Sequence, residues 1–182
     1  MQVNSTLATL IDTVTRHLVF LCGLLLIQIS GAYAQSELSK ETKLKAAYLF
    51  NFTKYIEWPS EAFSDKVQAV NICIHENLEM VDFMRALVDK RKVGKNQRLV
   101  KIWDFRDVKS CHLSFIQEER DAPHPKIDAS LVVADLDFEN GLSPAMRFYQ
   151  QNGKLRFEIF MDEMEKQHVT VSSELLKLAR IK

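Results

Sequence analysis

The chain has 182 residues, of which 24 are Lys or Arg and 24 are Asp or Glu, and 47% are hydrophobic. This balance of charge produces no long-range field that would steer the protein onto DNA or anionic lipid, so we expect no nucleic acid among its partners. The length suits one ordinary domain after a short leader, and no repeat or low-complexity tract divides it.

The beginning of the chain has the layout of a secretory signal peptide. An apolar run from Leu18 to Ile29 follows Arg16-His17 and precedes an Ala-Tyr-Ala triplet. A positive flank, a short apolar core and small residues at spacing two are typical of a leader that is cleaved after export. An uncleaved membrane anchor is the alternative, but a spanning helix needs about 20 apolar residues. We predict a signal peptide at residues 1–34 and one exported domain at residues 35–182.

The first helix of the domain is predicted at Glu41–Trp58. Apolar residues recur there three and four positions apart, which is the spacing of one helical face. These residues are Leu44, Ala47, Tyr48, Phe52, Tyr55 and Ile56. Pro59 ends the helix, because a proline forces the preceding residue toward extended geometry.

Strand and helix signals alternate in the next part of the chain. The expected elements are a strand at Val67–Ile74, a helix at Leu78–Val88, and strands at Arg98–Trp103, Cys111–Ile116 and Leu131–Ala134. Four apolar residues in a row at 131–134 indicate a strand that is buried on both faces. Asp135 and Asp137 follow this strand and would suit a ligand site at its carboxyl end. We interpret them instead as part of an exposed acidic turn.

The clearest turn signal is Asn152-Gly153, because this pair tolerates the positive φ angles of a tight hairpin turn. It joins strands that are expected at Met146–Tyr149 and Leu155–Phe160. In the second of these strands, Arg156 and Glu158 alternate with apolar residues and therefore face the opposite side.

The last part of the chain is predicted to end in a helix that docks through its apolar residues. We expect a short helix at Asp162–His168, an extended segment at Val169–Val171 and a last helix at Glu174–Arg180, capped by Ser172 or Ser173. Alternating strands and helices followed by a hairpin predict an α/β fold. The prediction is a single domain with a mixed β-sheet flanked by helices, a late β-hairpin and a C-terminal helix.

The cysteines of the predicted mature chain are Cys73 and Cys111. An even count in an oxidising compartment favours a disulfide, which would close a loop of about 40 residues and contribute roughly 4 kcal/mol. Two alternatives stay open, namely two buried free thiols and a zinc site that adds His75 and His112. The four residues lack the usual C-x2-4-C and H-x3-5-H spacings, so we expect no metal.

No catalytic motif with a recognisable spacing occurs in the chain. A Gly-x-Ser-x-Gly elbow, a His-Glu-x-x-His helix and a dinucleotide-binding glycine pattern are all absent. We therefore do not expect an enzyme, and we assign neither a catalytic residue nor a cofactor.

Four blocks of the sequence, in order, resemble the YfiR-like family of exported proteins. They are Lys45–Phe52 with Ile56–Pro59, Cys111–Leu113, Arg156–Ile159 and Val171–Arg180. The resemblance implies a periplasmic α/β domain that tends to dimerise and that represses an inner-membrane diguanylate cyclase by binding its sensing domain. Such binding lowers cyclic di-GMP and restrains biofilm formation. Cys73 and Cys111 match a bridging cysteine pair of the family.

Arg156 and Glu158, together with the exposed residues of the last helix, form our candidate partner-binding surface. The alternative is that these two charges pair within the sheet or with a neighbouring helix. A second function also stays open, namely a periplasmic small-ligand-sensing domain that acts on another membrane signalling protein. Such a domain would need a sizeable apolar pocket with a few convergent polar groups.

Overall fold

The computed structural model describes residues 16, 38–63, 68–107, 110–117, 130–135 and 143–182. The predicted signal peptide, apart from Arg16, and the predicted acidic residue Asp137 lie outside these ranges. Residues 38–182 form one compact unit. Among the helices in the described ranges, none has both the length and the apolar character that crossing a membrane requires.

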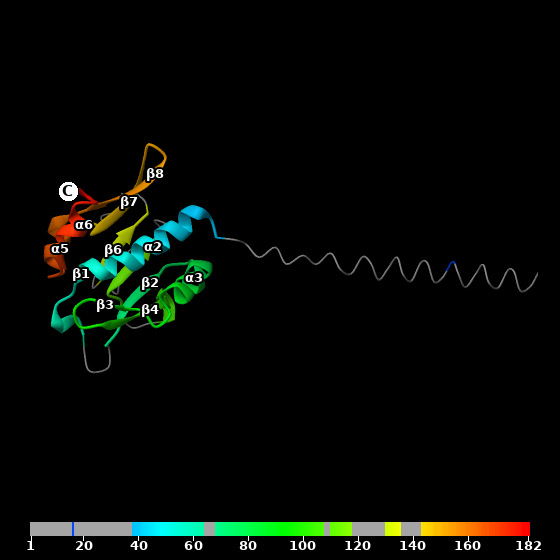
Figure 1. Cartoon of the computed structure of the whole chain (residues 1–182), viewed down its shortest axis with the longest axis horizontal. Helices are drawn as coiled ribbons and strands as arrows, with labels where there is room; N and C mark the ends of the chain where they lie inside the picture. The colour runs from blue at the N-terminus through cyan, green and yellow to red at the C-terminus, as the bar shows by residue number, and fades with distance from the viewer. Residues whose placement is uncertain (1–15, 17–37, 64–67, 108–109, 118–129, 136–142) are drawn as a thin grey trace, which may run out of the picture. The chain divides into compact units, whose positions relative to one another are not determined.

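The unit contains an eight-stranded mixed sheet in the order β10-β8-β7-β6-β5-β2-β4-β3 (Figure 1). In chain order these strands are β2 (Val70–Ile74), β3 (Lys92–Val93), β4 (Arg98–Asp104), β5 (Leu113–Ile116), β6 (Leu131–Ala134), β7 (Met146–Gln151), β8 (Lys154–Ile159) and β10 (Arg180–Ile181). The run from β4 through β2, β5 and β6 to β7 is parallel. The hairpin strands β7 and β8 are antiparallel, as the predicted turn requires. Both turn residues, Asn152 and Gly153, have positive φ angles of 52° and 69°.

Two longer helices pack side by side against the same face of this sheet. They are α2 (Lys40–Tyr55) and α3 (Leu78–Val88), and each begins at a residue whose side chain caps it. Ser39 accepts a hydrogen bond from the Thr42 N–H, and Asn77 accepts one from the Met80 N–H. Each cap satisfies one backbone donor that the first turn of a helix leaves without a partner.

The helix α2 ends three residues earlier than the sequence predicted. Residues Ile56–Glu57 form a short strand, β1, which pairs with β9 at Thr170–Val171 in a separate two-stranded sheet. The Ser172 N–H also donates to the Tyr55 carbonyl, at the position where the helix stops. A strand partner that is distant in sequence therefore ends α2 before Pro59.

The predicted apolar stripe of α2 is only partly buried. Leu44 and Tyr55 are 46% and 38% exposed, whereas Ala46 and Leu49 are fully buried. The reason is that α2 packs against α3 as well as against the sheet, so its buried face is broader than the predicted stripe and is rotated away from it.

The main core lies between these two helices and the sheet. The rings of Tyr48, Phe52, Phe148 and Phe157 meet where α2 crosses the hairpin, with centroids 5.0 to 6.0 Å apart. A smaller cluster occupies the other face of the sheet, because residues in a strand alternate between its two sides. It consists of Cys73, Phe105, Cys111, Ile116 and Val132, with Trp103 packed against it.

The last helix is shorter than predicted. The helix α5 (Met161–Lys166) is followed by β9 and then by α6, which covers only Ser173–Leu176 and is capped by Ser172. The segment Arg180–Ile181 is extended and pairs in parallel with Glu158 and Ile159 of β8. The predicted helix to Arg180 is therefore wrong beyond Leu176. Residues 180–181 pair with β8 instead, and the spacing of apolar residues could not show this distant partner.

Candidate functional site

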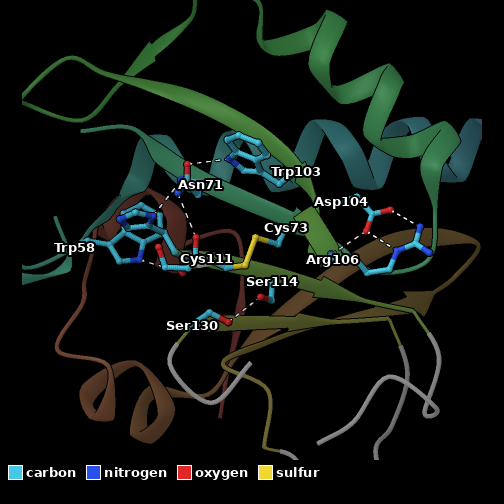
Figure 2. Close-up of a disulfide and its surroundings, with 11 residues drawn as sticks. Trp58, Asn71, Cys73, Trp103, Asp104, Arg106, Cys111, Ser114 and Ser130 are labelled. Carbon is cyan, nitrogen blue, oxygen red and sulfur yellow. Dashed lines mark hydrogen bonds and ion pairs between the residues drawn. A yellow bond between two sulfur atoms is a disulfide. The ribbon is translucent and has the colours of Figure 1, made fainter. Parts of the chain in front are cut away.

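Cys73 and Cys111 form a disulfide in the structure, with their Cα atoms 5.9 Å apart (Figure 2). The bond joins the middle of β2 to the segment before β5, on the face opposite α2 and α3. Both residues are buried. With both sulfur atoms in this bond, neither is free to act as a thiol or to bind zinc.

The two neighbouring histidines do not converge on a metal site. The His75 ring lies 3.8 Å from the Phe105 ring, measured between centroids, and His112 has its own separate partners. No group of three or more potential metal ligands occurs in the part of the chain that the structure describes.

His112 instead connects three segments through hydrogen bonds. Its Nδ1 accepts from the Asn71 backbone N–H at 3.1 Å, and its Nε2 lies 3.1 Å from the Ala62 carbonyl. An acceptor at Nδ1 and a donor at Nε2 define the neutral tautomer. The Trp58 indole N–H donates to the His112 carbonyl, and the Phe63 ring stacks on the imidazole at 4.7 Å. Burial lowers the pKa of His112 below its ordinary value, and the nearby Arg98 charge acts in the same direction.

Further hydrogen bonds join polar side chains near the disulfide (Figure 2). The Trp103 indole N–H donates to Asn71 Oδ1, and the Ser130 hydroxyl donates to Ser114. The buried carboxylate of Asp104 accepts from the Arg106 side chain, which holds the pKa of Asp104 at about 2. Among the described residues, these contacts engage the polar side chains nearest the bridge in Figure 2 and assemble no recognisable catalytic cluster there.

Arg156 and Glu158 share one side of the hairpin, as predicted, but only Arg156 is exposed. The Glu158 side chain is 1% exposed, and its carboxylate is bound by Arg147 from β7 and lies 3.7 Å from Arg180 of β10. The structure thus has the sheet pairing that was the alternative for Glu158, and the paired carboxylate is buried. The assignment of Arg156 to a partner contact stays a prediction.

We define the hairpin outer face as the side of β7, β8 and β10 that turns away from α2. It comprises Arg147, Tyr149, Arg156, Glu158 and Arg180, which are cross-strand neighbours. The Arg180 guanidinium lies over the Tyr149 ring, 4.1 Å from its centroid. Three cations against one buried carboxylate make this face basic.

A pocket of about 150 Å³ lies beside Trp58, Phe63 and Arg98. Pockets for small ligands usually measure about 300 to 1,000 Å³. The Arg98 guanidinium is also engaged already, because it stacks on the Phe63 ring at 3.7 Å and donates to Gln68. This pocket therefore gives little support to the small-ligand-sensing alternative.

An ion pair that sequence reasoning missed joins α2 to the carboxyl end of β6. Lys45 Nζ lies 2.7 Å from Asp135 Oδ2 and 2.5 Å from Glu41 Oε1, and the Lys45 side chain is only 10% exposed. Burial raises the pKa of Asp135, although its hydrogen bond with Lys45 opposes that shift. The Asp135 side chain is therefore paired with α2 and only 16% exposed, which corrects its predicted exposure.

The described residues define a disulfide-linked α/β domain with charged surfaces but without a recognisable catalytic centre. The YfiR/HmsC-like family model matches residues 42–180, so the chain belongs to the YfiR/HmsC-like family. Among curated proteins, none gives a significant match.

Proposed function

We propose that the protein is a periplasmic regulator that binds the sensing domain of an inner-membrane diguanylate cyclase and holds that enzyme inactive. The observation that carries this proposal is the family match, which spans nearly all of the predicted exported domain. The predicted signal peptide, the disulfide and the absence of a recognisable catalytic motif are consistent with it. Lower cyclic di-GMP and restrained biofilm formation would follow.

The regulator needs only to bind one state of its partner more tightly than the other. A preference of about 100-fold for the inactive cyclase stabilises that state by about 2.7 kcal/mol. No chemistry on the regulator is required for this preference.

We propose the hairpin outer face as the contact surface. Arg156 is exposed there, and Tyr149 and Arg180 form a stacked pair beside it. Arginine and tyrosine are enriched where protein interfaces gain most of their energy. Glu158 acts in this proposal by holding Arg147 and Arg180 in place from below, which fits its burial.

The experiment compares Arg156→Glu with Lys40→Glu, which reverses an exposed charge at the start of α2 and leaves the hairpin unchanged. We expect Arg156→Glu to reduce co-purification with a membrane diguanylate cyclase and to raise cellular cyclic di-GMP. The control variant should behave as the wild type, and both proteins should reach normal periplasmic levels.

Two results would contradict different parts of the proposal. If Arg156→Glu leaves binding and cyclic di-GMP unchanged at normal protein level, the contact surface is wrong. If the wild-type protein retains no diguanylate cyclase from solubilised membranes, and its deletion leaves cyclic di-GMP unchanged, the proposed function is wrong.

A further inference from the structure

The other end of the sheet, far from the hairpin in strand order, has a partly open edge. The edge strand β3 pairs only through Lys92 and Val93, opposite Leu99 and Arg98 of β4. Beyond Leu99, no strand in the described ranges lies on the outer side of β4. Val100 still bonds to Arg91, so the part of β4 that has no described strand beside it begins after Val100.

The backbone groups of Val100 and Ile102 in β4 point away from β2. The Val100 N–H donates to the Arg91 carbonyl at 3.2 Å, and Arg85 Nε donates to the Ile102 carbonyl at 3.3 Å. Both contacts lie on the side away from β2. Since the N–H and C=O of one strand residue point to the same side, the Val100 carbonyl and the Ile102 N–H also face outward. Because the Val100 N–H and the Ile102 carbonyl are already engaged, the Val100 carbonyl and the Ile102 N–H are the two groups that an incoming strand would use.

A groove of about 360 Å³ lies along this edge, between the end of α3 and β4. We call it the edge groove. Its lining is Arg85, Val88, Asp89, Lys90, Val100, Lys101, Ile102 and Trp103. The floor is apolar. Arg85 is paired with Asp82, and the exposed Lys90 and Lys101 outnumber Asp89, the carboxylate of the lining.

We propose that the edge groove binds an extended acidic segment of a partner protein, which adds a strand to the free part of β4. Main-chain hydrogen bonds to the Val100 carbonyl and the Ile102 N–H would align the segment. Its alternate carboxylates would share one face of the sheet with Lys101, and its apolar side chains would face α3. Strand addition of this kind takes its affinity from the backbone and its specificity from alternate side chains.

Charge selects this occupant over a second copy of the chain. Two copies paired edge to edge would bring two basic groove linings together, and like charges that face each other across a strand pair are destabilising. An acidic segment instead meets complementary charge, which favours both encounter and register.

This inference goes beyond the proposed function and does not depend on it. The edge groove lies at β4, and the hairpin outer face lies at β7, β8 and β10, near the opposite end of the strand order. Substitutions at one surface leave the other intact, so a failure of either proposal can be recognised separately.

The test uses the protein purified after expression of the whole chain and three fluorescein-labelled octapeptides. One alternates glutamate with valine, one has lysine in place of glutamate, and one is the glutamate–valine peptide methylated at every backbone nitrogen. Anisotropy gives the affinities, and amide chemical shifts give the location. Lys101→Glu is the test variant, Lys101→Met removes charge alone, and Lys154→Glu at the hairpin is the matched control.

We expect only the unmethylated glutamate peptide to bind, with shifts concentrated at residues 99–103. Lys101→Glu should weaken its affinity by about tenfold or more, Lys101→Met by less, and Lys154→Glu should have no effect. Unchanged melting temperatures would show that the variants fold. The proposal is overturned if the peptide does not bind at millimolar concentration, if the lysine or methylated peptide binds equally, or if the shifts lie elsewhere. It is also overturned if the edge instead pairs two copies of the chain.

Discussion

Arg147 and Glu158 face each other across the hairpin, and Arg147 Nε donates to the buried Glu158 carboxylate at 2.7 Å. Glu158 is almost fully buried, whereas a quarter of the Arg147 side chain is exposed. Because Arg180 of β10 approaches the same carboxylate, one side chain ties three strands together.

Glu158→Gln should therefore destabilise the domain. The amide keeps the shape of the side chain but removes the charge that compensates Arg147 and Arg180. We expect the free energy of unfolding to fall by about 2 kcal/mol, measured by urea denaturation. Arg156→Gln on the same strand is exposed and should change it by less than about 0.5 kcal/mol. If Glu158→Gln lowers the free energy of unfolding no more than Arg156→Gln does, the buried pairing does not stabilise the domain.

The disulfide should be a large contributor to stability. The Cys73→Ala/Cys111→Ala double variant frees a loop whose ends are 38 residues apart, which costs up to about 4 kcal/mol in the chain-entropy model. Thermal unfolding with and without a reductant measures the effect in the wild type. The double variant is the control, since a reductant should not change its melting temperature. A wild-type protein that is equally insensitive would contradict the prediction.

His112 should make stability depend on pH. Burial lowers its pKa in the folded state, so the folded protein resists protonation there and the unfolded chain does not. The contribution of the neutral imidazole is complete above the unfolded pKa of about 6.5 and is lost as the pH falls through the lower folded value. The slope cannot exceed about 1.4 kcal/mol per pH unit for one proton.

Urea titrations between pH 7.5 and 5 test this dependence. His112→Asn retains a side-chain acceptor but cannot be protonated, so its stability should vary less over the same interval. Asp104 does not interfere, because its pKa of about 2 places its transition well below this range. Parallel curves for the variant and the wild type would assign the pH dependence to other groups.

The buried ion pair between Lys45 and Asp135 can be tested by a double-mutant cycle. Lys45→Met should cost about 2 kcal/mol, because Asp135 loses the cation that compensates it in a largely buried site. Adding Asp135→Leu should recover much of this loss, since an apolar pair replaces two buried charges. Additive effects of the two substitutions would show that the residues are not coupled.

The elements that sequence reasoning located well are those whose signals are local. The bounds of α3 were predicted without error, β6 was predicted from four apolar residues, and the hairpin turn followed from Asn152-Gly153. Each of these rests on apolar spacing or on backbone preferences of neighbouring residues, which do not need the rest of the fold.

The features that were missed depend on partners far apart in the chain. The end of α2 depends on pairing with β9, and the strand at Arg180–Ile181 depends on β8. Alternation placed Glu158 on the outer side of the hairpin correctly, but it could not show that Arg147 and Arg180 would cover it. The same applies to Lys45, whose partner Asp135 lies 90 residues further along the chain.

The pairing of β10 with β8 also bears on how the protein can be handled in the laboratory. The Lys182 N–H donates to the Ile159 carbonyl, and the Met161 N–H donates to the Lys182 carbonyl, so Lys182 is hydrogen-bonded to the rest of the fold. An affinity tag fused after Lys182 would emerge beside the hairpin outer face and could mask the very association it is used to detect. Deleting residues 180–182 would remove Arg180 from the Glu158 carboxylate and expose that charge. Tags and truncations are therefore better placed before α2.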